Sequence, residues 1–230
     1  MNKIKTAIAA LFCLTLFNVS SAQADFGIGA TGQWINVSAE GSEKPSVNPN
    51  SARDTESASV SNNALIGSVF AEYRSDFYGL VLGYEYTPGS ADVSDGVKSR
   101  QDTEKSVSGD ATQNTDTRDF KAQAEIENYN IIYAEVPVMG NVYARLGYAE
   151  LDVNTLEVKS SNGGNYGNTT LDGINLGVGY KNGNWKLSYE MTDFDDLSIT
   201  STGNSANSGT NTVTADLDVW GLKLAYGFYF

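Results

Sequence analysis

Seven charged residues lie on the glycine-rich side of short segments in which apolar and polar residues alternate. They are Glu72, Arg74, Glu85, Arg145, Lys186, Glu190 and Lys223. Enclosed together in a narrow space, these acids and bases would have to pair, because an unpaired buried charge costs several kcal/mol. Two interpretations remain open. The charges form a salt-bridged plug that fills an interior, or they line a gated polar path for water or small ions.

Other residues offer little chemistry. The chain has no histidine, so a Ser-His-Asp arrangement cannot be built and the commonest transition-metal ligand is missing. The acidic run Asp193, Asp195 and Asp196, together with Asp92, Asp95 or Asp172, could supply oxygen ligands to calcium, but the spacing matches no EF-hand loop. We interpret this run as a solvated acidic rim. We therefore expect no enzyme, no catalytic residue, no metal site and no cofactor.

The elements that must position the seven charges are β-strands. Apolar and polar residues alternate with period 2 in short segments, and the chain is rich in Tyr (13) and Gly (23) but poor in Pro (4). Eight strands are predicted, at Phe26–Ser38, Ala64–Arg74, Phe77–Tyr86, Glu127–Glu135, Asn141–Val153, Leu171–Lys181, Asn184–Ile199 and Val213–Phe230.

The predicted connections alternate between short and long. Short turns are expected at Ser75-Asp76, Pro137–Gly140 and Asn182-Gly183, the last being a strong hairpin signal. The other connections are long and polar, at Ala39–Asn63, Thr87–Ile126, Asn154–Thr170 and Thr200–Thr212. Short turns at one end and long loops at the other are typical of transmembrane β-barrels, which have an even number of strands.

The last strand separates its two faces most clearly. One face is apolar and carries Trp220, Leu222, Leu224, Tyr226, Phe228 and Phe230. The opposite face carries small residues and Lys223, which suits a narrow lumen. Alternation alone would also fit a soluble barrel with its apolar face inward, so a soluble periplasmic ligand-binding barrel is kept as an alternative.

The fourth predicted strand is ambiguous. Tyr129, Ile131 and Tyr133 suit a lipid-facing side, yet Glu125, Glu127 and Glu135 share their parity. We expect those acids to lie beyond the hydrocarbon at the ends of the strand.

The start of the chain predicts export. Lys3 and Lys5 precede an apolar run, and Ala22-Gln23-Ala24 gives a signal-peptidase site. This predicts a signal peptide over 1–24 and a barrel domain over 25–230. The single cysteine, Cys13, lies inside the signal, so no disulfide is expected. A formal net charge of −13 argues against a nucleic-acid partner.

The terminal run Leu222-Lys223-Leu224-Ala225-Tyr226-Gly227-Phe228-Tyr229-Phe230 resembles the assembly signal of small outer-membrane barrels of the OmpA/OmpX and opacity-protein type. The repeated idioms Leu176-Gly177-Val178-Gly179-Tyr180 and Ala144-Arg145-Leu146-Gly147-Tyr148 are similar to the strands of that family. The resemblance implies insertion into a Gram-negative outer membrane by the barrel-assembly machinery with periplasmic chaperones. It also implies contact with outer-membrane lipid and lipopolysaccharide. No peptidoglycan-binding segment is expected after Phe230.

The sequence thus predicts an all-β fold, an eight-stranded antiparallel up-and-down transmembrane β-barrel preceded by a cleaved signal peptide. We expect a structural role, or a cell-surface role in which the long polar loops bind an extracellular partner. The alternative in another class is a narrow porin-like channel for water or small ions.

Overall fold

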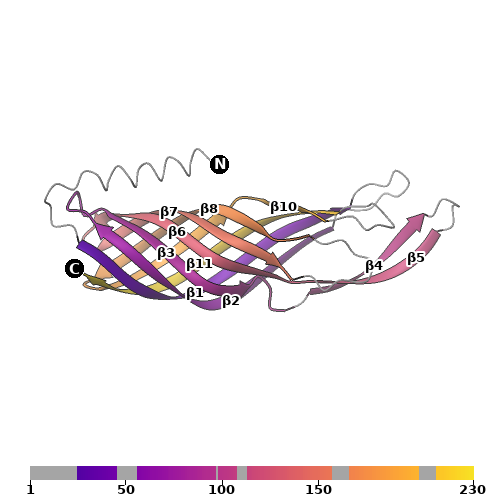
Figure 1. Ribbon diagram of the computed structural model, residues 1–230, viewed down its shortest axis with the longest axis horizontal. Coiled ribbons are helices and arrows are strands. Elements are labelled where there is room, and N and C mark those ends of the chain that lie inside the picture. The colour runs from indigo at the N-terminus through magenta and orange to yellow at the C-terminus, as the bar shows by residue number, and fades with distance from the viewer. Residues whose placement is uncertain (1–24, 46–55, 97, 108–112, 157–165, 202–210) are drawn as a thin grey trace.

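The structure is a computed structural model that describes residues 25–45, 56–96, 98–107, 113–156, 166–201 and 211–230. The predicted signal peptide lies outside these residues. Within them the chain forms eleven strands (Figure 1): β1 (Asp25–Pro45), β2 (Glu56–Arg74), β3 (Val81–Asp92), β4 (Lys98–Val107), β5 (Gln113–Ala122), β6 (Ala124–Met139), β7 (Val142–Thr155), β8 (Thr169–Asn182), β9 (Trp185–Phe194), β10 (Leu197–Thr200) and β11 (Asn211–Tyr229). No helix in the described ranges is long and apolar enough to cross a membrane.

Eight of the strands close into a ring. The order is β1-β2-β3-β6-β7-β8-β9-β11, every neighbouring pair is antiparallel, and β1 pairs with β11 to complete the circle. This confirms the predicted eight-stranded up-and-down barrel. Closure leaves the ring without a free edge, as a spanning structure in lipid requires.

Several strands run further than predicted. β1, β2 and β11 are 21, 19 and 19 residues long, about twice what a membrane crossing needs. The short strand β10 follows β9 and extends the pairing on β11. The predicted loop Thr87–Ile126 contains the β4–β5 hairpin, which extends away from the ring in Figure 1.

The third predicted strand begins too early. Phe77 and Tyr78 belong to the turn between β2 and β3, where Tyr78 and Gly79 have φ angles of 53° and 68°. These left-handed conformations end the pleat. The turn is closed by the Ser75 N–H, which donates to the Leu80 carbonyl at 2.8 Å, so β3 begins at Val81.

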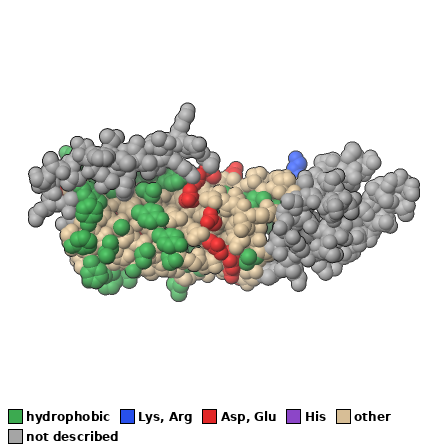
Figure 2. Space-filling view, in the orientation of Figure 1, with side chains coloured by type: hydrophobic (Ala, Val, Ile, Leu, Met, Phe, Trp, Pro, Cys, Tyr) green, Lys and Arg blue, Asp and Glu red, His purple; other side chains and the backbone are tan. Residues whose placement is uncertain are grey.

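The outside of the ring is apolar over one half of its height. Figure 2 shows hydrophobic side chains gathered over that half, bordered by a line of acidic side chains. The predicted outer face of β11 is confirmed, since Leu222, Leu224 and Phe228 are 50%, 49% and 61% exposed. Trp34 and Trp220 pack edge to face at 5.2 Å on this outer surface. Such an aromatic pair suits a membrane interface.

The face prediction for the fourth strand is wrong. In β6, Tyr129, Ile131 and Tyr133 are buried in the interior, whereas Ile132 and Val136 are on the outside. The physical reason is that this face ends in Glu135, which is buried beside a lysine, and strict alternation carries the tyrosines inward with it.

Glycines on the inner face make room for aromatic rings. A Cβ on Gly83 would lie 2.2 Å from the Tyr133 ring, and one on Gly179 would lie 2.3 Å from the Tyr143 ring. Each ring therefore lies directly over a glycine of another strand. This close approach is why the inner face of the sequence is glycine-rich.

Candidate functional site

The lumen is the candidate site, because the ring gathers most of the predicted charges there. Six of the seven are buried, with exposed fractions between 1% and 6%: Glu72, Glu85, Arg145, Lys186, Glu190 and Lys223. The seventh, Arg74, is half-buried at the end of β2 that leads into the short turn to β3. The six buried charges divide into two clusters.

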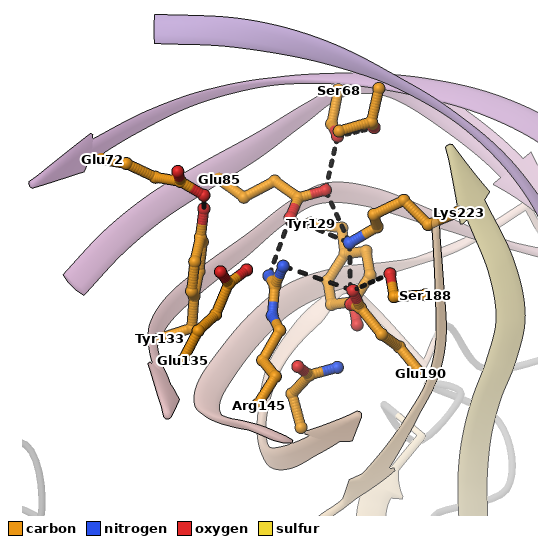
Figure 3. Close-up of polar contacts among 12 residues, drawn as sticks. Ser68, Glu72, Glu85, Tyr129, Tyr133, Glu135, Arg145, Ser188, Glu190 and Lys223 are labelled. Carbon is orange, nitrogen blue, oxygen red and sulfur yellow. Dashed lines mark hydrogen bonds and ion pairs between the residues drawn. The ribbon is translucent and has the colours of Figure 1, made fainter. Parts of the chain in front are cut away.

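The upper cluster contains two acids and two bases (Figure 3). The Arg145 guanidinium donates to Glu85 at 2.7 Å and lies 3.3 Å from Glu190. The Lys223 ammonium lies 2.8 Å from the Glu85 carboxylate and 2.7 Å from that of Glu190. Each acid is therefore shared by both bases, and the cluster is electrically neutral.

Hydroxyl groups complete the upper cluster. Ser68 donates to Glu85 at 2.5 Å and also lies in contact with Thr31, while Ser188 donates to Glu190 at 2.8 Å. These bonds use carboxylate lone pairs that the bases leave free. The charges come from β3, β7, β9 and β11, so the cluster braces opposite walls of the ring.

The lower cluster has an excess of acid. The Lys186 ammonium bonds Glu72 and lies 2.6 Å from Glu135. Glu72 also accepts from the Tyr133 hydroxyl at 2.8 Å and from the Tyr229 hydroxyl at 3.0 Å. One base thus serves two buried carboxylates.

The lumen changes character above the upper cluster. Tyr129 bonds Thr192 at 2.5 Å, and Asn175 donates to Thr192 at 2.9 Å. Beyond this polar layer the interior is apolar. It is formed by Ile35, Val37, Ala91, Val93, Ile126, Ala149, Leu151, Val153, Leu171, Phe194, Leu217 and Val219, and the same cluster continues down to the level of the charges through Tyr129, Ile131 and Tyr133. The interior is therefore layered, with charges toward the short turns and apolar side chains toward the opposite end.

The wall beside the apolar layer is incompletely paired. β2 pairs with β3 only between two positions, where Val69 faces Tyr86 and where Arg74 faces Val81. Its pairing with β1 continues further, as far as Glu56. Above that stretch β3 contains a register shift between Thr87 and Ser90. We call residues 63–68 of β2 the unpaired interval, since no described strand pairs with them on the β3 side. At its upper end Asn62 donates to the Asp92 carbonyl at 3.0 Å.

Sequence reasoning missed several of these residues. The sequence predicts Glu135 beyond the hydrocarbon and Tyr129 and Tyr133 toward lipid, whereas Tyr229 has the parity of the predicted lumen face. One signal could have identified Glu135: the opposite face of its strand, with Ile132, Ala134 and Val136, carries no charge at all. A strand with one purely apolar face directs its charged face inward in a membrane barrel.

The acidic run forms part of the outer rim. Asp193, Asp195 and Asp196 are exposed, and Asp193 is the cross-strand neighbour of Asp218. Partial burial and the nearby Asp193 carboxylate raise the pKa of Asp218 above its ordinary value. Among the described residues, no three acidic side chains converge as a metal site would require.

Comparison with known proteins agrees with the architecture. No family model matches the chain, and no curated protein matches it. Among solved structures, the chain is similar to the outer membrane protein OprG from Pseudomonas aeruginosa, with 15% identity, a TM-score of 0.53, and coverage of 89% of this chain and 96% of OprG. It is also similar to the outer membrane protein AlkL in lipid bilayers, with 11% identity, a TM-score of 0.51, and coverage of 93% and 94%.

At these identities the likeness concerns the fold alone. The fold is that of a small outer-membrane β-barrel.

Proposed function

We propose that this chain is an outer-membrane protein that takes small apolar molecules into its outer end and releases them sideways into the membrane. The observation that carries this proposal is the unpaired interval beside an apolar upper lumen. Passage straight through the barrel is opposed by the two charge clusters, which an apolar molecule could cross only by separating buried ion pairs.

The position of the unpaired interval supports a lateral route. Leu65 and Val69, on the outer face beside it, are 83% and 54% exposed. Ile66, on the inner face, packs against the apolar layer. Here the wall is held by side chains and not by a hydrogen-bond ladder, so parting it costs less than breaking strand pairing in lipid.

An uptake assay tests the proposal. Cells that make the protein should take up the apolar dye N-phenylnaphthylamine faster than cells that lack it. Ile66→Asn places an amide in the apolar lumen and should slow uptake, whereas Ser61→Asn, on the outer face of the same strand, should not. Heat-modifiable migration on a gel checks that each variant folds. Equal uptake with and without the protein would refute the proposal.

The charge clusters also argue against a water or ion channel. An eight-stranded barrel has an interior just wide enough for side chains, and here paired charges occupy it. In planar bilayers the pure protein should give no ionic conductance, and steady single-channel steps would overturn this part of the proposal. A soluble periplasmic barrel is opposed by the exposed apolar belt, which would then face water.

The second candidate is a structural or cell-surface role through the outer end. The length of β1, β2 and β11 supports it, because about half of each strand exceeds what a membrane crossing needs. Protease treatment of whole cells should cut the protein outside the belt while leaving a membrane-protected fragment. Strong adhesion of expressing cells, with no effect on dye uptake, would favour this candidate over the first.

Export and assembly complete the proposal. We infer that residues 1–24 are removed as a signal peptide, and that Trp220, Leu222, Leu224, Tyr226, Phe228 and Phe230 form the signal that the barrel-assembly machinery and chaperones recognise in a Gram-negative cell. A relationship to the OmpA/OmpX and opacity type is supported by this terminal strand. N-terminal sequencing should find Asp25 first.

A further inference from the structure

The periplasmic mouth of the lumen carries two cations that lie around one aromatic ring. Arg74, at the end of β2, places its guanidinium carbon 3.0 Å from the centroid of the Tyr229 ring. The Lys181 ammonium, near the end of β8, lies 5.7 Å from the same centroid. Both residues have the parity of the inner face of their strands. We call these three residues the basic mouth.

The two glutamates of the lower cluster are already engaged. Glu72 is bonded to Lys186, Tyr133 and Tyr229, and Glu135 is bonded to Lys186. Neither Arg74 nor Lys181 takes part in the ion pairs that join described side chains. Counting the mouth, the described lumen side chains include five bases, at 74, 145, 181, 186 and 223, and four glutamates.

Arg74 has donors that are buried without a partner. Its Nε and Nη2 atoms are inaccessible and make no hydrogen bond with the rest of the described chain. A buried guanidinium donor that lacks an acceptor is costly. The guanidinium fork matches an oxyanion with two oxygens, and a nearby ammonium adds a point charge.

From these observations we propose that the basic mouth is a binding site for a single phosphate group, held by Arg74 and Lys181 at the periplasmic end of the lumen. The phosphate could be free in the periplasm or belong to a phospholipid headgroup of the inner leaflet. The site is separate from the apolar upper lumen and does not depend on what passes there.

A titration tests the site. The full barrel in detergent micelles is titrated with inorganic phosphate at constant ionic strength and followed by ³¹P NMR. We expect saturable binding by the wild type and at least a tenfold weaker affinity for Arg74→Gln and for Lys181→Gln, since each removes a charge-assisted contact. The matched control is Lys44→Gln, which removes an exposed lysine at the opposite end of β1 and should bind as the wild type does. Heat-modifiable migration confirms that each variant is folded.

Two further measurements distinguish free phosphate from a phospholipid headgroup, and either of them from a carboxylate of the protein itself. If a headgroup is the ligand, vesicles containing phosphatidylglycerol should prevent phosphate binding, whereas a neutral detergent should not. Asp25 is the register neighbour of Arg74. If the Asp25 carboxylate were the partner of Arg74, the wild type would not bind phosphate and Asp25→Asn would. That result, linear uptake without saturation, or equal affinities in wild type and Arg74→Gln would each overturn the proposal.

Discussion

Replacement of Lys186 by methionine should strongly destabilise the barrel. The ammonium bonds Glu72 and lies 2.6 Å from Glu135, and all three side chains are at most 5% exposed. Glu72 would keep its two tyrosine donors, but Glu135 would lose its one described hydrogen bond. Removing one partner of a buried pair costs about 3–5 kcal/mol, and we expect the upper part of that range because a buried carboxylate remains alone.

A second substitution separates this effect from lost packing. In Lys186→Met/Glu135→Gln only Glu72, which keeps its two tyrosine donors, remains as a carboxylate without its base. The double variant should therefore be more stable than the single one by about 1–3 kcal/mol, the usual cost of a buried group without a partner. Lys44→Met, at an exposed site on β1, should change stability by no more than about 0.5 kcal/mol.

Urea unfolding in lipid vesicles, followed by tryptophan fluorescence, measures all three variants. Trp34, Trp185 and Trp220 all have exposed or half-exposed side chains on the outer face, so the signal reports loss of the lipid contact. The reasoning would be refuted by a cost below about 1 kcal/mol for the single variant, which an exposed ion pair would give. A double variant as unstable as the single one would refute it as well.

Three other substitutions test the faces of the wall. Gly83→Ala should cost about 1–3 kcal/mol because its Cβ would overlap a tyrosine ring, whereas Gly32→Ala, with nothing within 4 Å, should cost less in the same urea assay. Leu224→Arg should cost about 2–4 kcal/mol in vesicles if the outer face of β11 meets the centre of the bilayer, and much less if it does not. Asp218→Asn should stabilise the protein at neutral pH, because the raised pKa of Asp218 means that its ionised form opposes folding. The advantage should disappear as pH falls through that raised pKa toward the ordinary value of 3.8, and a gain that persists in acid would contradict the assignment.

The ring itself could be predicted because lipid imposes a strict rule on sequence. A strand with lipid on one side and a narrow lumen on the other must alternate, so β8, β9 and β11 are evident from their residues. The upper parts of β1 and β2 could not be predicted in the same way. There one face of Ser57–Asn63 carries only Ser and Asn, and the other carries Ala58, Val60 and Asn62, too few large apolar residues to mark a strand. Such a segment looks like a loop although it is held by pairing with its neighbour.

Which charged side chains pair within the lumen could not be predicted, for a different reason. Alternation places Glu85, Arg145 and Lys223 on inner faces, but which of them meet depends on the stagger of strands far apart in sequence. Lys223 and Glu85 are 138 residues apart, and they join because β11 and β3 lie across the same level of the ring. The sequence prediction for Glu135 is wrong because it exchanges the two faces of β6. A shift of one residue moves every side chain of a strand to the opposite face.

The charge clusters lie at the level where β2 and β3 are paired, and the proposed lateral route lies above them. The paired stretch of β2 and β3 sets Phe70 opposite Glu85 and Glu72 opposite Gly83, so the clusters lie where the ring is fully laddered. Directional ion pairs there brace strands that are already joined. Above Val69 the ladder stops, and the interior is held by apolar contacts, which are non-directional and can be remade around a guest of similar chemistry. On the proposed route, an apolar molecule that enters the outer end would meet the charge clusters below it and the unpaired interval beside it.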